Sequence, residues 1–139
     1  MSAEQNKALM GRLIEEVFNQ GKLDILDEIC NVNYILEAPG IPTEKGKKEG
    51  LELFKQLITS YRKAFDNLNV TIDETVAEDN MIAIGFSLSG THKGEFVGIA
   101  PTGKHVKLTE LGFAHLSDGK ISGLRLAPYG KPIKVLLSA

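Results

Sequence analysis

The spacing of apolar residues along the chain predicts helices first and strands afterwards. Apolar side chains recur every three or four residues over residues 3–19 and again over residues 48–65, as in a helix with one buried face. Ser2 and Gln5 have the spacing of a capping box, which places the start of the first helix. Asp24 is expected to cap a second, short helix, whose apolar residues are Ile25, Leu26 and Ile29.

Strands are expected wherever the apolar residues change to a period of two. A short strand is expected over residues 34–38, and longer ones over 68–72, 82–88, 104–116 and 121–127. Turn sequences separate them, Glu78-Asp79-Asn80 in one place and Asp118-Gly119 in another. The order of elements predicts a single α+β domain, residues 1–139, with helices packed on a curved antiparallel sheet.

A glycine-rich connection, residues 90–103, interrupts the strands and carries apolar residues of its own. Phe96, Val97 and Ile99 lie in it, so we expect the connection to fold over another part of the protein. The tail, residues 133–137, is also apolar and is expected to dock on the open face of the sheet or over the mouth of a pocket.

Composition and charge narrow the class of protein. The chain of 139 residues is 42% hydrophobic and 24% charged with a net charge of -2, a globular mixture that gives no reason to expect nucleic acid as a partner. A lysine cluster at Lys45, Lys47 and Lys48 is offset by neighbouring glutamates. Cys30 is the only cysteine, and the first residues contain no apolar run, so we expect a cytoplasmic protein with no membrane partner.

Motifs for metals and cofactors are missing from the sequence. His92 and His105 flank the glycine-rich connection, but two histidines do not make a metal site. No phosphate-binding loop, dinucleotide fingerprint or nucleophile elbow occurs. We therefore expect no cofactor and no bound metal.

Three stretches of sequence resemble one family. The stretch from Asn6-Lys7 to Val17-Phe18-Asn19-Gln20-Gly21, the connection from Gly90 to Lys104 and the hairpin Asp118-Gly119-Lys120-Ile121 are similar to SnoaL-like polyketide cyclases. The resemblance implies the cone-shaped fold of nuclear transport factor 2-like (cystatin-like) proteins, with a pocket for a small apolar ligand. It also implies a carboxylate that removes a proton beside a carbonyl, a histidine that steadies the enolate, and a homodimer formed through the open face of the sheet.

The chain departs from the family's usual residues at several positions. Leu36 and Glu37 stand where members often have Asp and His. After Gly119-Lys120-Ile121 the chain continues with Ser122-Gly123-Leu124-Arg125, so the family's Glu-His-Trp triplet is absent and Arg125 replaces the aromatic residue. An arginine of the family aligns with Gly85. A carboxylate of the last strand falls on Leu126 or Tyr129.

Glu37 and His115 are the catalytic candidates that remain. Glu37 between apolar neighbours could act as a base, or could form an ion pair with Arg125. His115 could donate to an enolate oxygen, or could be a structural residue of its strand. Glu110 is expected on the face opposite His115, toward solvent or a dimer contact. The candidate substrate-binding residues are Tyr34, Tyr61, Phe86, Phe96, Phe113, Arg125 and Tyr129.

Two functions follow from these residues. One is a cofactor-independent cyclase or isomerase that acts by acid-base chemistry on a small cyclic or polyketide-like substrate. The other is a binding module of the same fold that has lost the catalytic residues. An epoxide hydrolase is disfavoured because Arg125 lacks a pair of aspartates around it.

Overall fold

The computed structural model describes residues 2–38 and 48–138. The N-terminal half contains α1 (Ala3–Arg12), the π-helical η1 (Leu13–Asn19), α2 (Ile25–Ile29), β1 (Cys30–Glu37) and α3 (Lys48–Ala64). The capping box is confirmed, because the Gln5 N–H donates to the Ser2 hydroxyl at 3.1 Å and the Ser2 N–H donates to the Gln5 side chain at 2.8 Å. Asp24 precedes α2 but makes no side-chain cap. Lys45 and Lys47 of the lysine cluster lie outside the described residues.

The C-terminal half contains the long strands that the alternation predicts. They are β2 (Phe65–Glu78), β3 (Met81–His92), β4 (His105–Ser117) and β5 (Lys120–Pro128), followed by α4 (Ile133–Ser138). The hairpin between β4 and β5 turns at Asp118 and Gly119, whose φ angles of 53° and 76° are those that a tight hairpin turn requires.

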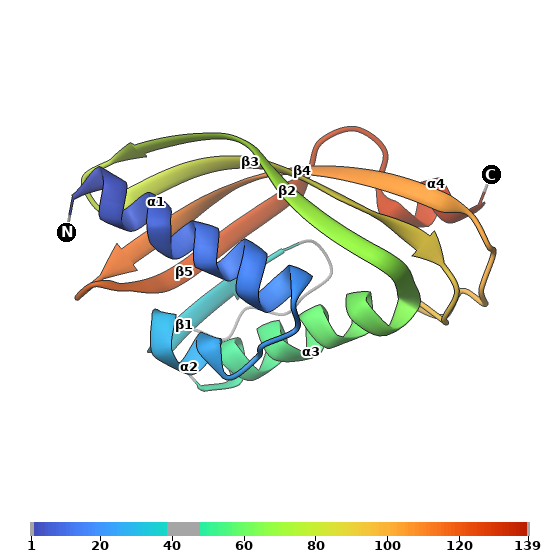
Figure 1. Cartoon of the computed structure of the whole chain (residues 1–139), viewed down its shortest axis with the longest axis horizontal. Helices are drawn as coiled ribbons and strands as arrows, with labels where there is room; N and C mark the ends of the chain where they lie inside the picture. Colours follow the sequence, from blue (N-terminus) through green and yellow to red (C-terminus); the bar gives the residue numbers. More distant parts are fainter. Residues whose placement is uncertain (1, 39–47, 139) are drawn as a thin grey trace.

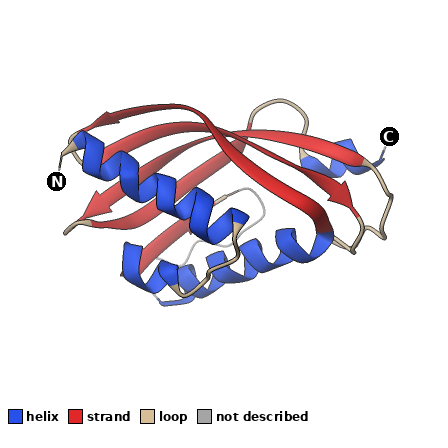
Figure 2. Cartoon of the chain, viewed as in Figure 1, coloured by secondary structure: helices blue, strands red, loops and turns tan. Residues whose placement is uncertain are grey.

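The strands form one curved, unclosed sheet with helices on one side (Figures 1 and 2). Their order across the sheet is β1-β5-β4-β3-β2. β2 to β5 run antiparallel, and β1 pairs with β5 in parallel at the edge. The expected α+β cone, with N-terminal helices on a curved sheet, is confirmed.

The sheet has an inner face, which packs on the helices, and an outer face, which is open. Along β4 the side chains of Val106, Leu108, Ala114 and Leu116 are buried, whereas His105, Lys107, Leu111, Phe113 and His115 are exposed. Since successive side chains of a strand point to opposite faces, the first set defines the inner face and the second the outer face. The inner face packs on buried side chains of α3 such as Phe54 and Ile58.

The apolar tail forms α4 and joins the core through one residue. Leu137 is 2% exposed, and the Lys104 ammonium donates to its carbonyl at 3.4 Å. Ile133 and Leu136 pack against the same core. The tail therefore packs on the core and not on the open face of the sheet, and its docking over the mouth of a pocket stays a prediction.

Candidate functional site

A carboxyl group, that of Glu110, lies on the inner face of the sheet. Glu110 alternates with the outward Leu111, and its register partners are Phe86 on β3 and Pro128 on β5. Burial raises the pKa of Glu110 from 4.5 to about 6. The expectation that Glu110 faces solvent or a dimer contact is wrong. A carboxyl with such a pKa is charged at neutral pH and more basic than an exposed one.

Tyr61 approaches the same region from the helical side. It lies on the buried face of α3, is 9% exposed, and packs its ring on Phe65 and Phe96. Burial and the negative charge of Glu110 both raise the pKa of Tyr61, so the two groups lie near each other and the hydroxyl keeps its proton. A proton acceptor and a hydrogen-bond donor thus face one interior region.

Other predicted binding residues also lie inside. Tyr34 is completely buried and stacks on Phe54 at 5.2 Å, and its hydroxyl has no partner among the described residues. Burial raises the pKa of Tyr34 well above its usual value. Phe86 is 6% exposed on the inner face of β3. The predicted substrate-binding side chains of Tyr34, Tyr61, Phe86 and Phe96 are therefore buried inside the protein.

Glu37 and His115 lie on the outer face, so the expectation that they project into the cone is wrong. Tyr34 and Leu36 of β1 point inward, which turns Glu37 outward. The Arg125 Nε donates to the Glu37 carboxylate at 3.1 Å, and the ion-pair alternative is thereby confirmed. The structure does bring the predicted pair to one shallow hollow of about 250 Å³, lined by Ile35, Glu37, His115, Ser122, Gly123, Leu124 and Arg125.

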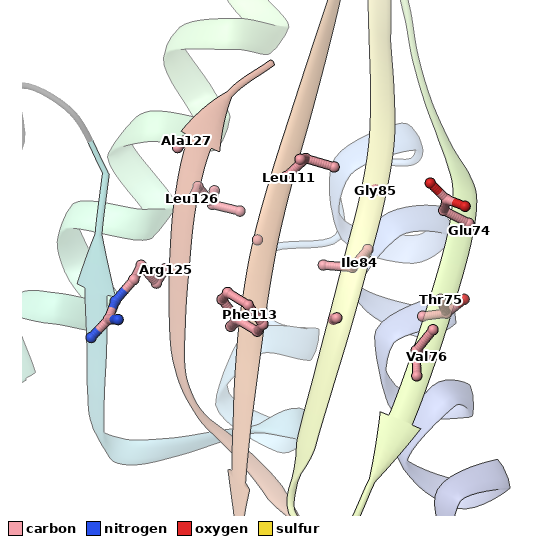
Figure 3. Close-up of a pocket in the computed structure, with 12 residues that line it drawn as sticks. Glu74, Thr75, Val76, Ile84, Gly85, Leu111, Phe113, Arg125, Leu126 and Ala127 are labelled. Carbon is pink, nitrogen blue, oxygen red and sulfur yellow. The ribbon is translucent and has the colours of Figure 1, made fainter.

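A wider groove of about 510 Å³ lies beside this hollow on the outer face (Figure 3). Figure 3 shows Leu111 and Phe113 on the viewer's side of the strands and the helices behind them, with Arg125 reaching toward β1. Phe113 is 48% exposed and Tyr129 is 66% exposed, so neither contributes to the interior.

The two histidines of the glycine-rich connection separate to opposite faces. His92 is completely buried, and its Nδ1 accepts the N–H of Thr102 at 3.1 Å, whereas His105 is exposed beside Thr91. Residues 2–38 and 48–138 contain no group of three side chains that could hold a metal ion. Within the same ranges, no helix has the length and apolar character needed to cross a membrane.

Comparison with known proteins agrees with this architecture. The family model of SnoaL-like polyketide cyclase matches residues 8–127. The aklanonic acid methyl ester cyclase AcmA of Streptomyces galilaeus is 30% identical over 112 residues, covering 79% of this chain and 75% of AcmA. The corresponding cyclase DnrD of Streptomyces peucetius is 28% identical over the same shares of the two chains.

Solved structures show the same fold. A protein from Jannaschia sp. CCS1, described as a SnoaL-like polyketide cyclase, superposes with a TM-score of 0.85 at 20% identity, covering 99% of this chain and 94% of its own. AclR from Streptomyces galilaeus, described as a hydroxylase, gives a TM-score of 0.81 at 22% identity, covering 98% and 82%. A one-layer curved sheet with helices on its inner face thus defines a cone of the nuclear transport factor 2-like class. The chain belongs to the SnoaL-like polyketide cyclase family.

Proposed function

We propose that the protein is a cofactor-independent cyclase or isomerase that acts on a small apolar cyclic or polyketide-like substrate. The observation that carries this proposal is the inner-face carboxyl of Glu110, whose negative charge, together with burial, raises the pKa of the buried Tyr61 hydroxyl. Family membership supports the class of reaction, and the relatives AcmA and DnrD are named as cyclases of aklanonic acid methyl ester.

The proposed chemistry uses the two groups in different ways. The Glu110 carboxylate removes a proton from a carbon next to a carbonyl, and the Tyr61 hydroxyl donates a hydrogen bond to the carbonyl oxygen as negative charge develops there. In a cyclase the enolate carbon then attacks a second carbonyl and closes a ring, and the alkoxide formed from that carbonyl takes the proton back from the acid form of Glu110. In an isomerase the same acid instead reprotonates the enolate at another carbon. The apolar side chains around Glu110 favour both steps because they keep the carboxylate poorly solvated.

A second location for the same chemistry is the outer-face hollow. It is supported by the presence of Glu37, His115 and Arg125 in one hollow. Against it, Glu37 is engaged by Arg125, and their side chains are 39% and 63% exposed. The Glu37 carboxylate is thus exposed to water and already occupied by a guanidinium, so we favour the interior.

Deuterium uptake from heavy water tests the proposal without knowledge of the natural product. A panel of cyclic ketones and polyketide-like keto esters is incubated with the protein, and loss of the acidic C–H signal is followed by NMR. We expect Glu110→Gln to lower the rate by about 100-fold or more and Tyr61→Phe by at least about tenfold. The wild-type rate should rise with pH through about 6, as Glu110 loses its proton.

Three further variants make the experiment decisive. Glu78→Gln removes an exposed carboxylate at the end of β2 and should leave the rate unchanged. If Glu37→Gln or His115→Gln abolishes exchange while Glu110→Gln does not, the site lies on the outer face. If the protein binds members of the panel but never accelerates exchange, the catalytic proposal fails and the binding-module alternative replaces it.

A further inference from the structure

Phe96 is a buried aromatic side chain in an otherwise exposed turn. It is 4% exposed, whereas its neighbours Glu95 and Val97 are exposed. The ring centroid of Phe96 lies 4.8 Å from that of Tyr61 and 5.4 Å from that of Phe65. Phe96 therefore covers the ring whose hydroxyl lies near Glu110.

The two ends of the connection that carries Phe96 are fixed to the body of the protein. The N–H groups of Lys93 and Gly94 both donate to the Ala64 carbonyl at the end of α3, at 2.9 and 3.0 Å. At the other end, the Thr102 N–H donates to the buried ring of His92 at 3.1 Å. These anchors hold the base of the connection whatever its tip does.

The tip, residues 95–99, is hydrogen-bonded only to itself within the described part of the chain. Phe96 and Ile99 exchange main-chain hydrogen bonds of 3.0 and 2.9 Å, and the Gly98 N–H donates to the Glu95 carboxylate at 2.6 Å. The tip is attached to the body through apolar contacts, which Phe96 and Ile99 make with the core. Rotation of the tip away from the body would break none of its own hydrogen bonds.

Backbone strain weakens the closed position of the tip. Val97 has a φ of 45°, in the left-handed region that a β-branched residue rarely adopts. Its side chain is 53% exposed, so burial of Val97 does not compensate for this conformation. Opening the tip frees Val97 to return to an extended conformation.

We propose that Phe96 is a removable plug, and that an apolar ring of the substrate takes its place against Tyr61. The size of the group that can bind there is then set by Phe96, which makes it a specificity-determining residue. This inference rests on the proposed function for its substrate class, but the movement of the plug can be measured without any reaction.

Binding of 2-naphthol, a flat apolar alcohol, measures whether a ligand ring can take the place of the Phe96 ring against Tyr61. Isothermal titration calorimetry at neutral pH compares the full-length wild type with three variants. We expect Phe96→Ala to bind 2-naphthol at least about tenfold more tightly, because the competing ring is gone. We expect Val97→Gly to bind it at least about threefold more weakly, because glycine relieves the strain of the closed turn. Leu26→Ala, a buried change in α2, should stay within about twofold of the wild type.

The result that overturns the proposal is equal or weaker binding by a folded Phe96→Ala protein, or tighter binding by Val97→Gly. If Phe96→Ala does not fold, Phe96→Leu takes its place and should bind 2-naphthol more tightly than the wild type.

Failure of the proposed function gives a different pattern of results from failure of the plug. Tighter naphthol binding without deuterium exchange in any variant supports the plug and rejects the enzyme. Deuterium exchange that depends on Glu110, together with unchanged naphthol binding in the Phe96 and Val97 variants, supports the enzyme and rejects the plug.

Discussion

At the scale of single residues, the raised pKa of Glu110 links stability to pH. The carboxyl has a pKa of about 6 in the folded protein and 4.5 when exposed, so between these values the folded state holds a proton that the unfolded chain has released. The folded state then binds more protons, and the free energy of unfolding falls as pH rises across this window. The loss amounts to about 2 kcal/mol and persists at higher pH, because a pKa difference of one unit corresponds to about 1.4 kcal/mol.

Urea denaturation at a series of pH values checks this prediction. Glu110→Gln cannot titrate, so we expect its free energy of unfolding to lack the fall of about 2 kcal/mol that the wild type undergoes between about pH 4.5 and 6.5. Glu78→Gln serves as the control, since this exposed carboxylate should leave the wild-type slope in place. A Glu110→Gln protein with the same slope as the wild type would show that Glu110 is not buried as described.

At the scale of elements, two helical glycines should respond oppositely to one substitution. A Cβ at Gly11 in α1 would meet no atom within 4 Å, whereas a Cβ at Gly50 in α3 would collide with the main-chain carbonyl of Tyr34 on β1. Alanine stabilises an unobstructed helix by about 1 kcal/mol relative to glycine. We expect Gly11→Ala to raise the free energy of unfolding by about that amount and Gly50→Ala to lower it by about 2 kcal/mol or more.

Thermal and urea denaturation of the two variants measure the contrast. Because both changes add the same methyl group to a helix, helix propensity cancels in the comparison and the packing of α3 on β1 remains. Equal effects at the two positions would contradict the close approach of Gly50 to β1.

The elements could be predicted from the sequence more fully than the site could. Apolar periodicity identified both long helices and all four long strands, because each buries one face. Along β4 the same alternation grouped Leu111, Phe113 and His115 correctly but did not say which group points inward. The apolar character of Leu111 and Phe113 favours the wrong face, because both side chains lie on an exposed surface.

A signal for the correct face was present in the sequence. Apart from Glu110 and Gly112, the group that contains Val106, Leu108, Ala114 and Leu116 is apolar, whereas the alternate group contains His105, Lys107 and His115. Weighing the whole strand in this way places Glu110 inward and identifies it as a site residue. The proximity of Glu110 to Tyr61 was out of reach, because it depends on how α3 crosses the sheet.

At the scale of the whole molecule, the outer face leaves a large apolar surface uncovered in the single chain. Val76, Leu111 and Phe113 are 68%, 48% and 48% exposed and lie on β2 and β4, on either side of β3, around the groove of Figure 3. Apolar patches of this kind on soluble proteins commonly mark interfaces. Glu74 lines the groove from β2 and Arg125 lines it from β5, so a negative and a positive charge lie at opposite edges of the same groove.

We propose that a second copy of this chain covers the outer face, related by a two-fold axis. In such a pair the same patch meets itself, so Arg125 of one copy can approach Glu74 of the other while the apolar side chains pack between them. This arrangement would also place the Glu37 and His115 hollow at the edge of the interface. It leaves the inner face, with Glu110 and Tyr61, open to ligand from the helical side.

Light scattering after gel filtration tests the pairing over a range of concentrations. We expect a dimer at about 10 µM for the wild type and a monomer for Phe113→Glu, because two glutamates would be buried without partners in an apolar interface. Val32→Glu introduces the same charge at an exposed valine of β1 that does not line the groove, and should stay dimeric. A monomeric wild type, or equal effects of the two changes, would contradict pairing through this face. The deuterium-exchange assay is then applied to the monomeric Phe113→Glu protein. We expect the wild-type exchange rate, because Glu110 and Tyr61 lie on the inner face and take no part in the proposed interface.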